Sequence, residues 1–483
     1  HIGASIKDNR FDELSVYGPI AGAPNIFNVV NLDKSQKKTP KTGWHEQTQS
    51  FFYSLELGWK SQLFVTTTGR NDWASQLANS PQKSFFYPSV GVSWLPSRTF
   101  NFPEKFNYLK IRASWASVAN PFPRELTIAT HPYDDTISGW DDKSNYPIGQ
   151  LYPERTKTWE LGFDARFLHG FTLSASWYRA DTYNQTFNPN LSASSGYSDI
   201  YIQTGHVRNT GVEASLGYDH QWKNWNWNSQ FTFSWNKNKI IELCKEWYNP
   251  ITEETITMNR LQISKLGRAK FILKEGGSMG DLYSTTDLRR DDKGNIEIDE
   301  GGNVVVEDNL PDMKLGSVFP DYNLAWRNSV SWKNLNLGFL VTARIGGIVN
   351  SLTQANMDLF GVSEATAAAR DAGGALVNGR SLVNPETWYT AIASQGGIPQ
   401  YYTYSATNVR LQELSLGYTI PRKWLHNVCS ITVSFVGRNL WMMYCKAPFD
   451  PEAVASTNNF YQGMDYFMMP STRNLGFNIN IKF

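Results

Sequence analysis

The sequence predicts an all-β protein, an antiparallel transmembrane β-barrel with long extracellular loops. Three observations support this fold class. Apolar and polar residues alternate over runs of about 10–14 residues, whereas soluble strands are usually about 5–6 residues long and tilted membrane strands need about 9–11. Trp and Tyr recur near the ends of these runs, where a barrel carries its aromatic girdles. Short turns alternate with long polar connections, which is the loop pattern of outer-membrane barrels.

Each alternating run predicts a strand with one apolar and one polar face, because successive side chains on a strand point to opposite faces. Glu160, Glu213 and Arg112 fall on polar faces, so we expect them to line a lumen; a charge facing lipid at mid-membrane costs about 2–4 kcal/mol. The predicted strands lie at 47–60, 109–115, 159–167, 171–177, 212–218, 225–235, 324–332, 335–343, 410–420, 431–441 and 473–483. The Trp residues near strand ends are Trp59, Trp94, Trp177, Trp225, Trp332 and Trp441.

The shortest connections predict the direction of the strands. They are 60–62, 168–170, 223–224 and 333–334. We expect all four on the periplasmic side, together with Phe483. The strands from 47–60 to the last one must then be odd in number, about 13 or 15, depending on whether 271–309 holds no membrane strand or two. The longest polar connections, 119–155 and 346–408, should reach the outside and contact a partner or ligand.

One stretch departs from the β pattern. Residues 353–371 contain the run Ala-Thr-Ala-Ala-Ala-Arg and few β-branched residues, which predicts a helix inside a long loop, ended by Gly373 and Gly374.

Composition and motifs indicate no enzyme and no cofactor. The net charge of +1 provides no basic field for nucleic acid. The seven His have no Glu or Cys partner at ligand spacing, and the three Cys have no metal-ligand spacing. Cys429 and Cys445 can be bridged only if the fold brings them together. Residues 291–299 are similar to a calcium loop, but Lys293 stands where an oxygen ligand is needed, which favours a polar hairpin turn.

The C-terminal segment is the first specific motif. Its apolar residues repeat with strict period two, and the chain stops on an aromatic residue. This segment is similar to the assembly signal that outer-membrane barrels present to their insertion machinery. The residues of this barrel-assembly signal are Leu475, Phe477, Ile479, Ile481 and Phe483.

A series of short motifs over about 47–483 resembles the SusC/RagA family of TonB-linked outer-membrane transporters. Each motif is weak alone, but their common order along the chain is specific. They are 63–72 (LFVTTTGRND), 86–90 (FYPSV) with Trp94, 109–115 (LKIRASW), 151–156 (LYPERT) with 159–162 (WELG), 209–213 (NTGVE), 409–421 (VRLQELSLGYTIP), 437–440 (GRNL), 450–452 (DPE) and 470–473 (PSTR).

The resemblance implies an architecture and partners. Residues 43–483 are expected to form the C-terminal part of the barrel, and 1–42 a loop or incoming segment. A family member would also have an N-terminal plug, a TonB-contacting segment and further barrel strands, none of which is in this sequence. The implied function is active import of an oligosaccharide or peptide across the outer membrane, energised through TonB, with a SusD-like surface lipoprotein as lid.

About 13–15 strands are fewer than the 22 of plugged transporters, and an open sheet cannot span lipid. We therefore expect a partial barrel. The last strand should pair on one edge with 431–441, and both it and the strand at 47–60 should have a neighbour outside this chain. A smaller closed ring would instead indicate a porin-like barrel.

Two other functions remain open at this point. A passive pore or adhesin would have the same strands, and a liposome leak assay would distinguish it. A soluble carbohydrate-binding or hydrolytic β protein would not depend on detergent for solubility. The aromatic residues of the loops are weak candidates for ligand binding: Tyr133, Trp140, Tyr146, Tyr183 and Tyr197.

Overall fold

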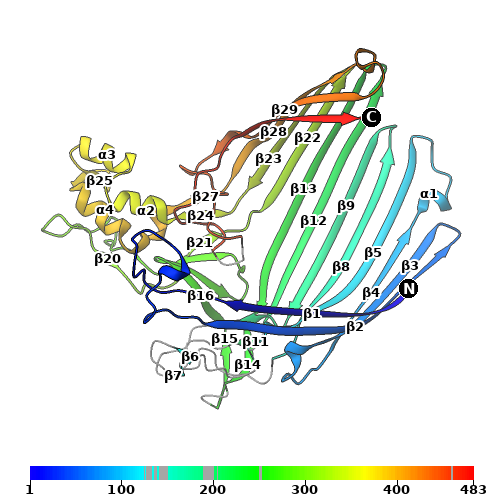
Figure 1. The fold of residues 1–483 in the computed structure, drawn as a ribbon. Coiled ribbons are helices and arrows are strands. Elements are labelled where there is room, and N and C mark those ends of the chain that lie inside the picture. Colours follow the sequence, from blue (N-terminus) through cyan, green and yellow to red (C-terminus); the bar gives the residue numbers. More distant parts are fainter. Residues whose placement is uncertain are drawn as a thin grey trace.

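One 14-stranded antiparallel sheet dominates the computed structural model (Figure 1). The structure describes residues 1–124, 126, 133–134, 139–140, 151–188, 201–203, 205–249, 253–457 and 461–483. In sheet order the strands are β1 (Ile2–Leu14), β2 (Lys41–Trp59), β3 (Leu63–Ala74), β4 (Phe85–Trp94), β5 (Phe106–Asn120), β8 (Glu154–Phe167), β9 (Phe171–Tyr183), β12 (His206–Trp222), β13 (Trp225–Glu242), β22 (Tyr322–Trp332), β23 (Leu335–Ile345), β28 (Asn408–Ile420), β29 (Ser430–Cys445) and β31 (Asn474–Lys482).

The strand prediction is confirmed, and the count from β2 to β31 is 13, which is odd as expected. Residues 271–309 add no strand to this sheet, because β17 and β18 belong to a separate four-stranded sheet. One strand was missed. β1 lies in the segment expected to be a loop or incoming segment, and it pairs with β2 along its whole length. Its apolar alternation covers only Ile2, Ala4 and Ile6, too few positions to indicate a strand.

The predicted short turns all lie at one end of the sheet, with the C-terminus (Figure 1). They join β2 to β3, β8 to β9, β12 to β13 and β22 to β23. In the first turn, Lys60 and Ser61 both have positive φ (50° and 54°), and Leu168 and His169 repeat this in the second. Two consecutive positive φ values at the centre of a turn match the right-handed twist of the flanking strands. The long connections therefore all leave from the opposite end, here called the long-loop end.

The apolar face of the sheet is exposed, and this excludes a soluble sandwich. Leu161 is 53% exposed, Leu57 60% and Phe435 51%. In a sandwich, these side chains would be buried against a second sheet. A contiguous exposed apolar face of this extent is a lipid-facing surface, as the alternation predicted.

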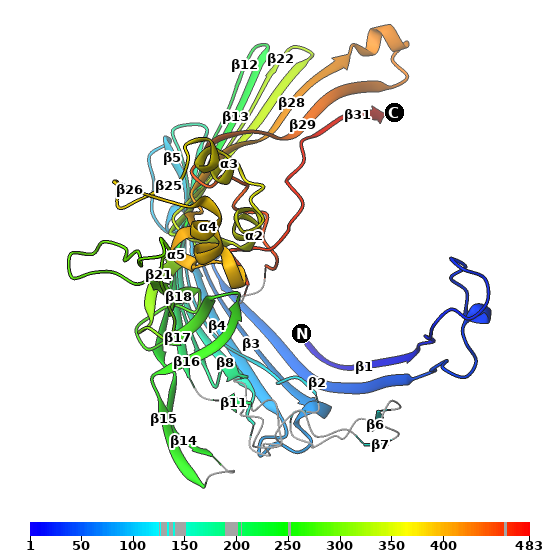
Figure 2. The same cartoon turned by 90° about the vertical axis from the view of Figure 1, so that its left-hand side faces the viewer.

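The sheet is curved but does not close. Viewed from the long-loop end (Figure 2), it is an open C with β1 and β31 at its two tips. β31 pairs with β29 through Ser430–Arg438, as predicted. Within the described residues, neither the far edge of β31 nor that of β1 pairs with another strand. The strand at 47–60 is not an edge strand, contrary to expectation, because β1 covers it. Among the described strands, β1 and β31 do not pair to close the smaller ring that would indicate a porin-like barrel.

The long connections fold together into a compact cap. Phe271 and Leu282 from one connection, Leu352 from the next and Met464 from a third share one buried core. Strand pairing also links these connections. β24 pairs with β27 of its own connection and with β30 of the β29–β31 connection. The cap is therefore one folded body made of three loops.

The cap and the smaller loops contain the remaining elements. The helices are α1 (Pro96–Thr99), α2 (Leu352–Leu359), α3 (Glu364–Asp371), α4 (Pro385–Ala393) and α5 (Pro399–Tyr402). The short strands are β6 (Tyr133–Asp134), β7 (Gly139–Trp140), β10 (Thr186–Phe187), β11 (Ile202–Gln203), β14 (Cys244–Asn249), β15 (Glu254–Met258), β16 (Arg260–Leu266), β17 (Ala269–Lys274), β18 (Asp281–Ser284), β19 (Asp287–Leu288), β20 (Val306–Glu307), β21 (Met313–Ser317), β24 (Ile348–Ser351), β25 (Ala375–Val377), β26 (Ser381–Val383), β27 (Thr403–Ser405) and β30 (Met464–Asp465).

The single helix predicted at 353–371 is wrong in one respect, because the structure has two helices there, α2 and α3. Gly361 between them has φ 67°, which ends α2. The side chain of Ser363 then accepts the N–H of Thr366 and caps α3, and Gly373 follows its end as predicted. Among the described residues, no helix has the length and apolar composition needed to cross a membrane.

Two smaller predictions concern residues 291–299 and the cysteines. The polar turn is confirmed. The Asp291 carboxylate accepts hydrogen bonds from the backbone N–H groups of Lys293 (2.9 Å) and Asn295 (2.8 Å), which are donors within the same turn. Cys429 and Cys445 are not brought together, and neither forms a disulfide bond.

If the apolar face of the sheet meets lipid, arginine should destabilise the protein more at one of two adjacent residues of β29 than at the other. Phe435→Arg places a cation on the apolar face and should lower the free energy of unfolding by about 2–4 kcal/mol. Ser434→Arg places the same cation on the polar face and should cost well under half as much. Denaturant unfolding of the full-length protein in lipid measures both. Equal losses for the two variants would contradict the assignment.

Candidate functional site

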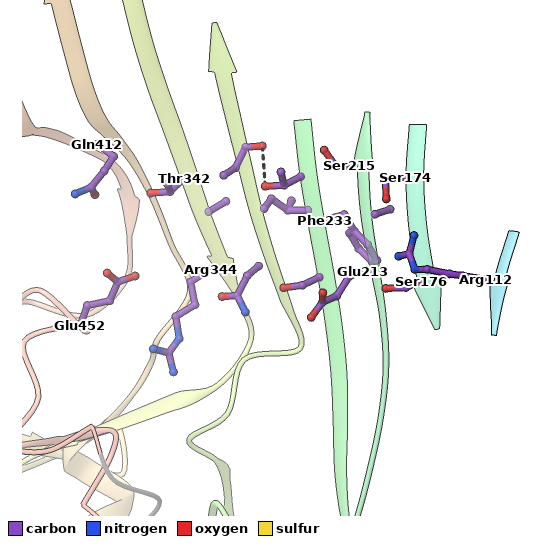
Figure 3. A pocket seen from close by; sticks show the side chains of 17 residues that line it. Arg112, Ser174, Ser176, Glu213, Ser215, Phe233, Thr342, Arg344, Gln412 and Glu452 are labelled. Atoms are coloured by element: carbon purple, nitrogen blue, oxygen red, sulfur yellow. Dashed lines mark hydrogen bonds between the residues drawn. The ribbon is translucent and has the colours of Figure 1, made fainter. Parts of the chain in front are cut away.

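A hollow of about 680 Å³ lies on the polar face of the sheet (Figure 3). Strands β5, β9, β12, β13, β22, β23 and β28 contribute to its wall, and the connection between β29 and β31 adds Glu452. Because cross-strand partners share a face, the polar side chains of these strands converge there. Most of them carry hydroxyl groups: Ser174, Ser176, Ser215, Thr232, Ser234 and Thr342.

One end of the hollow is bounded by an ion-pair network. Arg112 lies 2.8 Å from Asp164 and 3.6 Å from Glu160. The hydroxyl of Ser174 donates to the other oxygen of Asp164 (2.7 Å). The predicted lumen-facing placement of Arg112, Glu160 and Glu213 is confirmed, and the positive charge of Arg112 is balanced at this end.

The opposite end of the hollow holds Arg344 and Glu452 (Figure 3). Arg344 donates one Nη hydrogen bond to the carbonyl of Val318 (2.8 Å), at the base of the cap. Its buried Nε has no hydrogen-bond partner within the described part of the chain. The Glu452 side chain is 42% exposed, so its carboxylate is accessible. The Arg344 side chain lines the hollow, so this end presents a guanidinium group beside an accessible carboxylate.

Glu452 is held in place by a buried cluster around Arg410. The guanidinium of Arg410 donates two hydrogen bonds to Asp450 (2.8 and 3.1 Å) and one to Asn408 (3.1 Å), and lies 3.4 Å from Glu452. Both members of the Arg410–Asp450 pair are nearly inaccessible, with side chains 5% and 9% exposed. A bidentate pair of this kind fixes geometry as well as charge. It fastens the β29–β31 connection to the inner wall.

The same cluster sets the protonation of Asp450. Burial alone raises the pKa of this carboxyl, but the hydrogen bonds from Arg410, the backbone N–H of Glu452 and the Ser471 hydroxyl outweigh it. The pKa of Asp450 is therefore below its ordinary value of 3.8. Stability from this pair is fully present above that value and is lost as the pH falls through the lowered pKa.

The chemistry of the hollow is that of a binding surface. Hydroxyl groups and amides accept and donate hydrogen bonds, and charges of both signs stand at the two ends. Among the described residues, no group of three or more His, Cys, Asp or Glu is placed to hold a metal ion.

The structure locates the loop aromatics that the sequence suggested for ligand binding. Tyr183 ends β9 on the same face as Trp177, where its ring stacks on His206 (4.5 Å), and it does not line the hollow. Tyr133 and Trp140 are paired through β6 and β7, but their side chains lie outside the described residues. Tyr146 and Tyr197 also lie outside them. A ligand role for these five remains a prediction.

Sequence reasoning missed Arg344 and Glu452 as site residues. The sequence contained a hint of each. Glu452 belongs to the DPE motif, and Arg344 falls in step with the alternate positions of its strand that face the polar side. Their meeting depends on a long connection folding back onto the wall, which alternation does not reveal.

Comparison with known proteins identifies similar chains. The family model described as TonB dependent receptor-like, beta-barrel matches residues 3–440. "TonB-dependent receptor P3" of Formosa agariphila is 26% identical, covering 96% of this chain and 49% of that protein. "TonB-dependent receptor SusC" of Bacteroides thetaiotaomicron is 21% identical, covering 78% of this chain and 38% of SusC. The chain thus spans about half or less of the length of these relatives.

Solved structures share the fold. The RagAB peptide importer in its "open-open" state gives a TM-score of 0.77 at 18% identity, covering 100% of this chain and 52% of the other. Its "closed-closed" state gives 0.75 at 18% identity, with 99% and 52% covered. At this identity the likeness concerns the arrangement of strands alone.

The Arg410 cluster predicts a selective local destabilisation. Arg410→Gln leaves the buried Asp450 carboxylate unpaired and should destabilise the β29–β31 connection by about 3–5 kcal/mol. Arg438→Gln is the matched control, since Arg438 is 65% exposed and its pair with Glu413 is worth at most about 1 kcal/mol. Amide hydrogen exchange at Ala453 and Ala455 measures the effect. Equal protection in both variants would refute the role of the cluster.

The lowered pKa of Asp450 predicts the pH dependence of the same connection. Its amide protection, corrected for intrinsic exchange, should stay constant from neutral pH to about pH 4 and fall only below that. Asp450→Asn should remove this acid transition. A loss of protection between about pH 5 and 7 would mean that another group controls the connection.

Proposed function

Because this chain belongs to the TonB dependent receptor-like β-barrel family, we propose that it forms the wall, outer loops and part of the ligand path of an active importer in the outer membrane. The substrate class is an oligosaccharide or a peptide. Import is energised through TonB, which engages an N-terminal part of the same protein. No bond of the substrate is made or broken.

The hollow on the polar wall is the observation that carries this proposal. One end of it lies against the cap, because Arg344 donates to the carbonyl of Val318 and Glu452 belongs to the β29–β31 connection. A solute that enters past the cap therefore meets the hydroxyl-lined wall next. A ligand here would change the surroundings of the cap, which fits a transporter better than a static pore.

The chemistry of the hollow supports the substrate class. Clustered hydroxyl groups match the hydroxyl and amide groups of sugars and peptides. Arg344 and Glu452 add one cation and one anion, which suit the charged ends or side chains of a peptide. RagAB, whose strand arrangement this chain shares, is described as a peptide importer.

The partners follow from the same assignment. A plug and further strands from the N-terminal part complete the barrel, and a SusD-like surface lipoprotein covers the cap. The cap presents apolar side chains suited to that lid. Phe360 is 74% exposed and Val362 68%, between α2 and α3, and Leu376 (65%) and Leu382 (62%) extend from β25 and β26.

The hollow is tested by uptake. The double variant Arg344→Gln/Glu213→Gln should raise the apparent KM for the cognate nutrient roughly tenfold, since a hydrogen bond to a charged group is worth about 1.5–3 kcal/mol. Lys293→Gln, in an exposed turn of the cap, is the control and should have no effect. Unchanged uptake in the double variant would remove the hollow from the ligand path. Passive conductance of the full-length protein in liposomes would instead support a pore.

The lid surface is tested separately. Deleting 353–371 should impair lid binding or uptake without stopping membrane insertion, but the deletion would also remove Ala355 and Leu359 from the cap core. Phe360→Ser/Val362→Ser is therefore the sharper variant, because it changes only exposed residues. We expect the lipoprotein to co-purify with the wild type and less with the variant. Equal co-purification and unchanged uptake would contradict this.

A further inference from the structure

The outer face of the sheet carries a basic cluster at one height on four neighbouring strands. We define the outer-face basic cluster as Lys157 of β8, Arg179 of β9, Arg208 of β12, and Lys237 and Lys239 of β13. Cross-strand pairing places Lys157, Asp181, Arg208 and Lys239 in one row. The row next to it toward the short turns contains Trp159, Arg179, Thr210 and Lys237.

The cluster begins where the lipid-facing apolar surface ends. The adjoining row toward the short turns is Leu161, Trp177, Val212 and Trp235. Arg179 lies eight residues from Phe171, which is about 20 Å along the membrane normal for a strand tilted by about 40°. An outer-membrane barrel carries an apolar band about 25 Å tall. The basic side chains therefore stand at the level of the lipid headgroups.

The cluster is confined to these strands. At the same height and on the same face, neighbouring β5 presents Trp115 and Ser117, and β22 ends at Tyr322. A general interfacial girdle would continue around the sheet. A patch spanning three strand spacings, about 14 Å, is instead the size of a discrete site.

A buried carboxylate organises the arginines. Asp181 is 7% exposed and accepts the Nε–H groups of Arg208 (2.7 Å) and Arg179 (2.8 Å) and a hydrogen bond from His206 (2.6 Å). Asp181 uses only the Nε of each arginine, and the side chains of Arg179 and Arg208 remain 41% and 29% exposed. Asp181 thus fixes both guanidinium groups before any ligand arrives.

The lysines supply charge that this carboxylate does not balance. Lys157, Lys237 and Lys239 are exposed, and within the described residues none of them makes an ion pair. The Nζ of Lys157 lies over the ring of Tyr183 at 5.3 Å, which holds the ammonium on the outer surface. Five cations stand around one buried anion, while the chain as a whole has a net charge of only +1.

We propose that the outer-face basic cluster binds a phosphate-bearing lipid headgroup of the leaflet at the long-loop end. Paired arginine forks and exposed ammonium groups are the side chains that phosphate oxygens prefer. The Trp residues of the two neighbouring rows provide the apolar contact for the acyl chains below. This binding is independent of the transported substrate, because the cluster and the hollow lie on opposite faces of the sheet.

The test uses the full-length protein in detergent micelles, with bound lipid counted by native mass spectrometry. The probes are phosphatidic acid, phosphatidylcholine and inorganic phosphate. We expect phosphatidic acid to bind at least tenfold more tightly than phosphatidylcholine. The variant Lys157→Gln/Lys237→Gln/Lys239→Gln should lose that preference, and it changes only exposed side chains.

The matched control is Lys265→Gln/Lys293→Gln/Arg380→Gln, which removes the same charge from exposed cap positions and should bind as the wild type does. Heat-modifiable gel mobility shows whether each variant is folded. Wild-type lipid preference in the cluster variant would overturn the proposal. So would displacement of the lipid by an equal concentration of inorganic phosphate, which would indicate a free-anion site. Capture of an acidic protein in place of lipid, lost in the cluster variant, would likewise overturn it.

Discussion

The pairing of backbone N–H and C=O groups in hydrocarbon is the constraint on which the rest of the structure depends. Each unpaired group costs several kcal/mol in lipid, so a sheet that spans a membrane must close. The 14 strands form an open C, with the far edges of β1 and β31 unpaired within the described residues. The backbone groups of these edges would find partners if further strands completed the cylinder.

The same constraint divides the two faces of the sheet by chemistry. Lipid requires the outer face to be apolar, and so the charged groups collect on the inner face or beyond the apolar band. Arg112 and Arg344 lie on the inner face, and the outer-face basic cluster lies beyond the apolar band. The cap completes the inner face, because the buried Arg410–Asp450 pair ties a long connection to the wall and sets Glu452 at the end of the hollow. The proposed ligand path and the proposed lipid contact thus lie on opposite sides of one sheet.

Period-two alternation was sufficient to predict the wall, because in a membrane strand one face must be apolar along its whole length. It failed where that requirement is weak: β1 alternates clearly only at Ile2, Ala4 and Ile6. The helix at 353–371 was placed correctly but not divided, since the stop at Gly361 and the cap at Ser363 need local geometry. Lumen residues such as Arg112 and Glu213 followed from parity. Arg344 with Glu452 did not, because their proximity comes from the folding of a connection onto the wall. Tyr183 lies an even number of residues from Trp177 on the same strand, so alternation places both side chains on the outer face.

We propose that this chain is part of a larger barrel in which β1 and β31 are not neighbours. The distance between the two edges can be measured by pulsed electron–electron double resonance. Spin labels are placed at Ile6→Cys and Phe477→Cys in the full-length protein, in which Cys244, Cys429 and Cys445 are replaced by Ser. A barrel of about 22 strands places about eight strands between them, which predicts a distance above about 25 Å. A distance below about 15 Å would mean that the edges adjoin and would contradict the account.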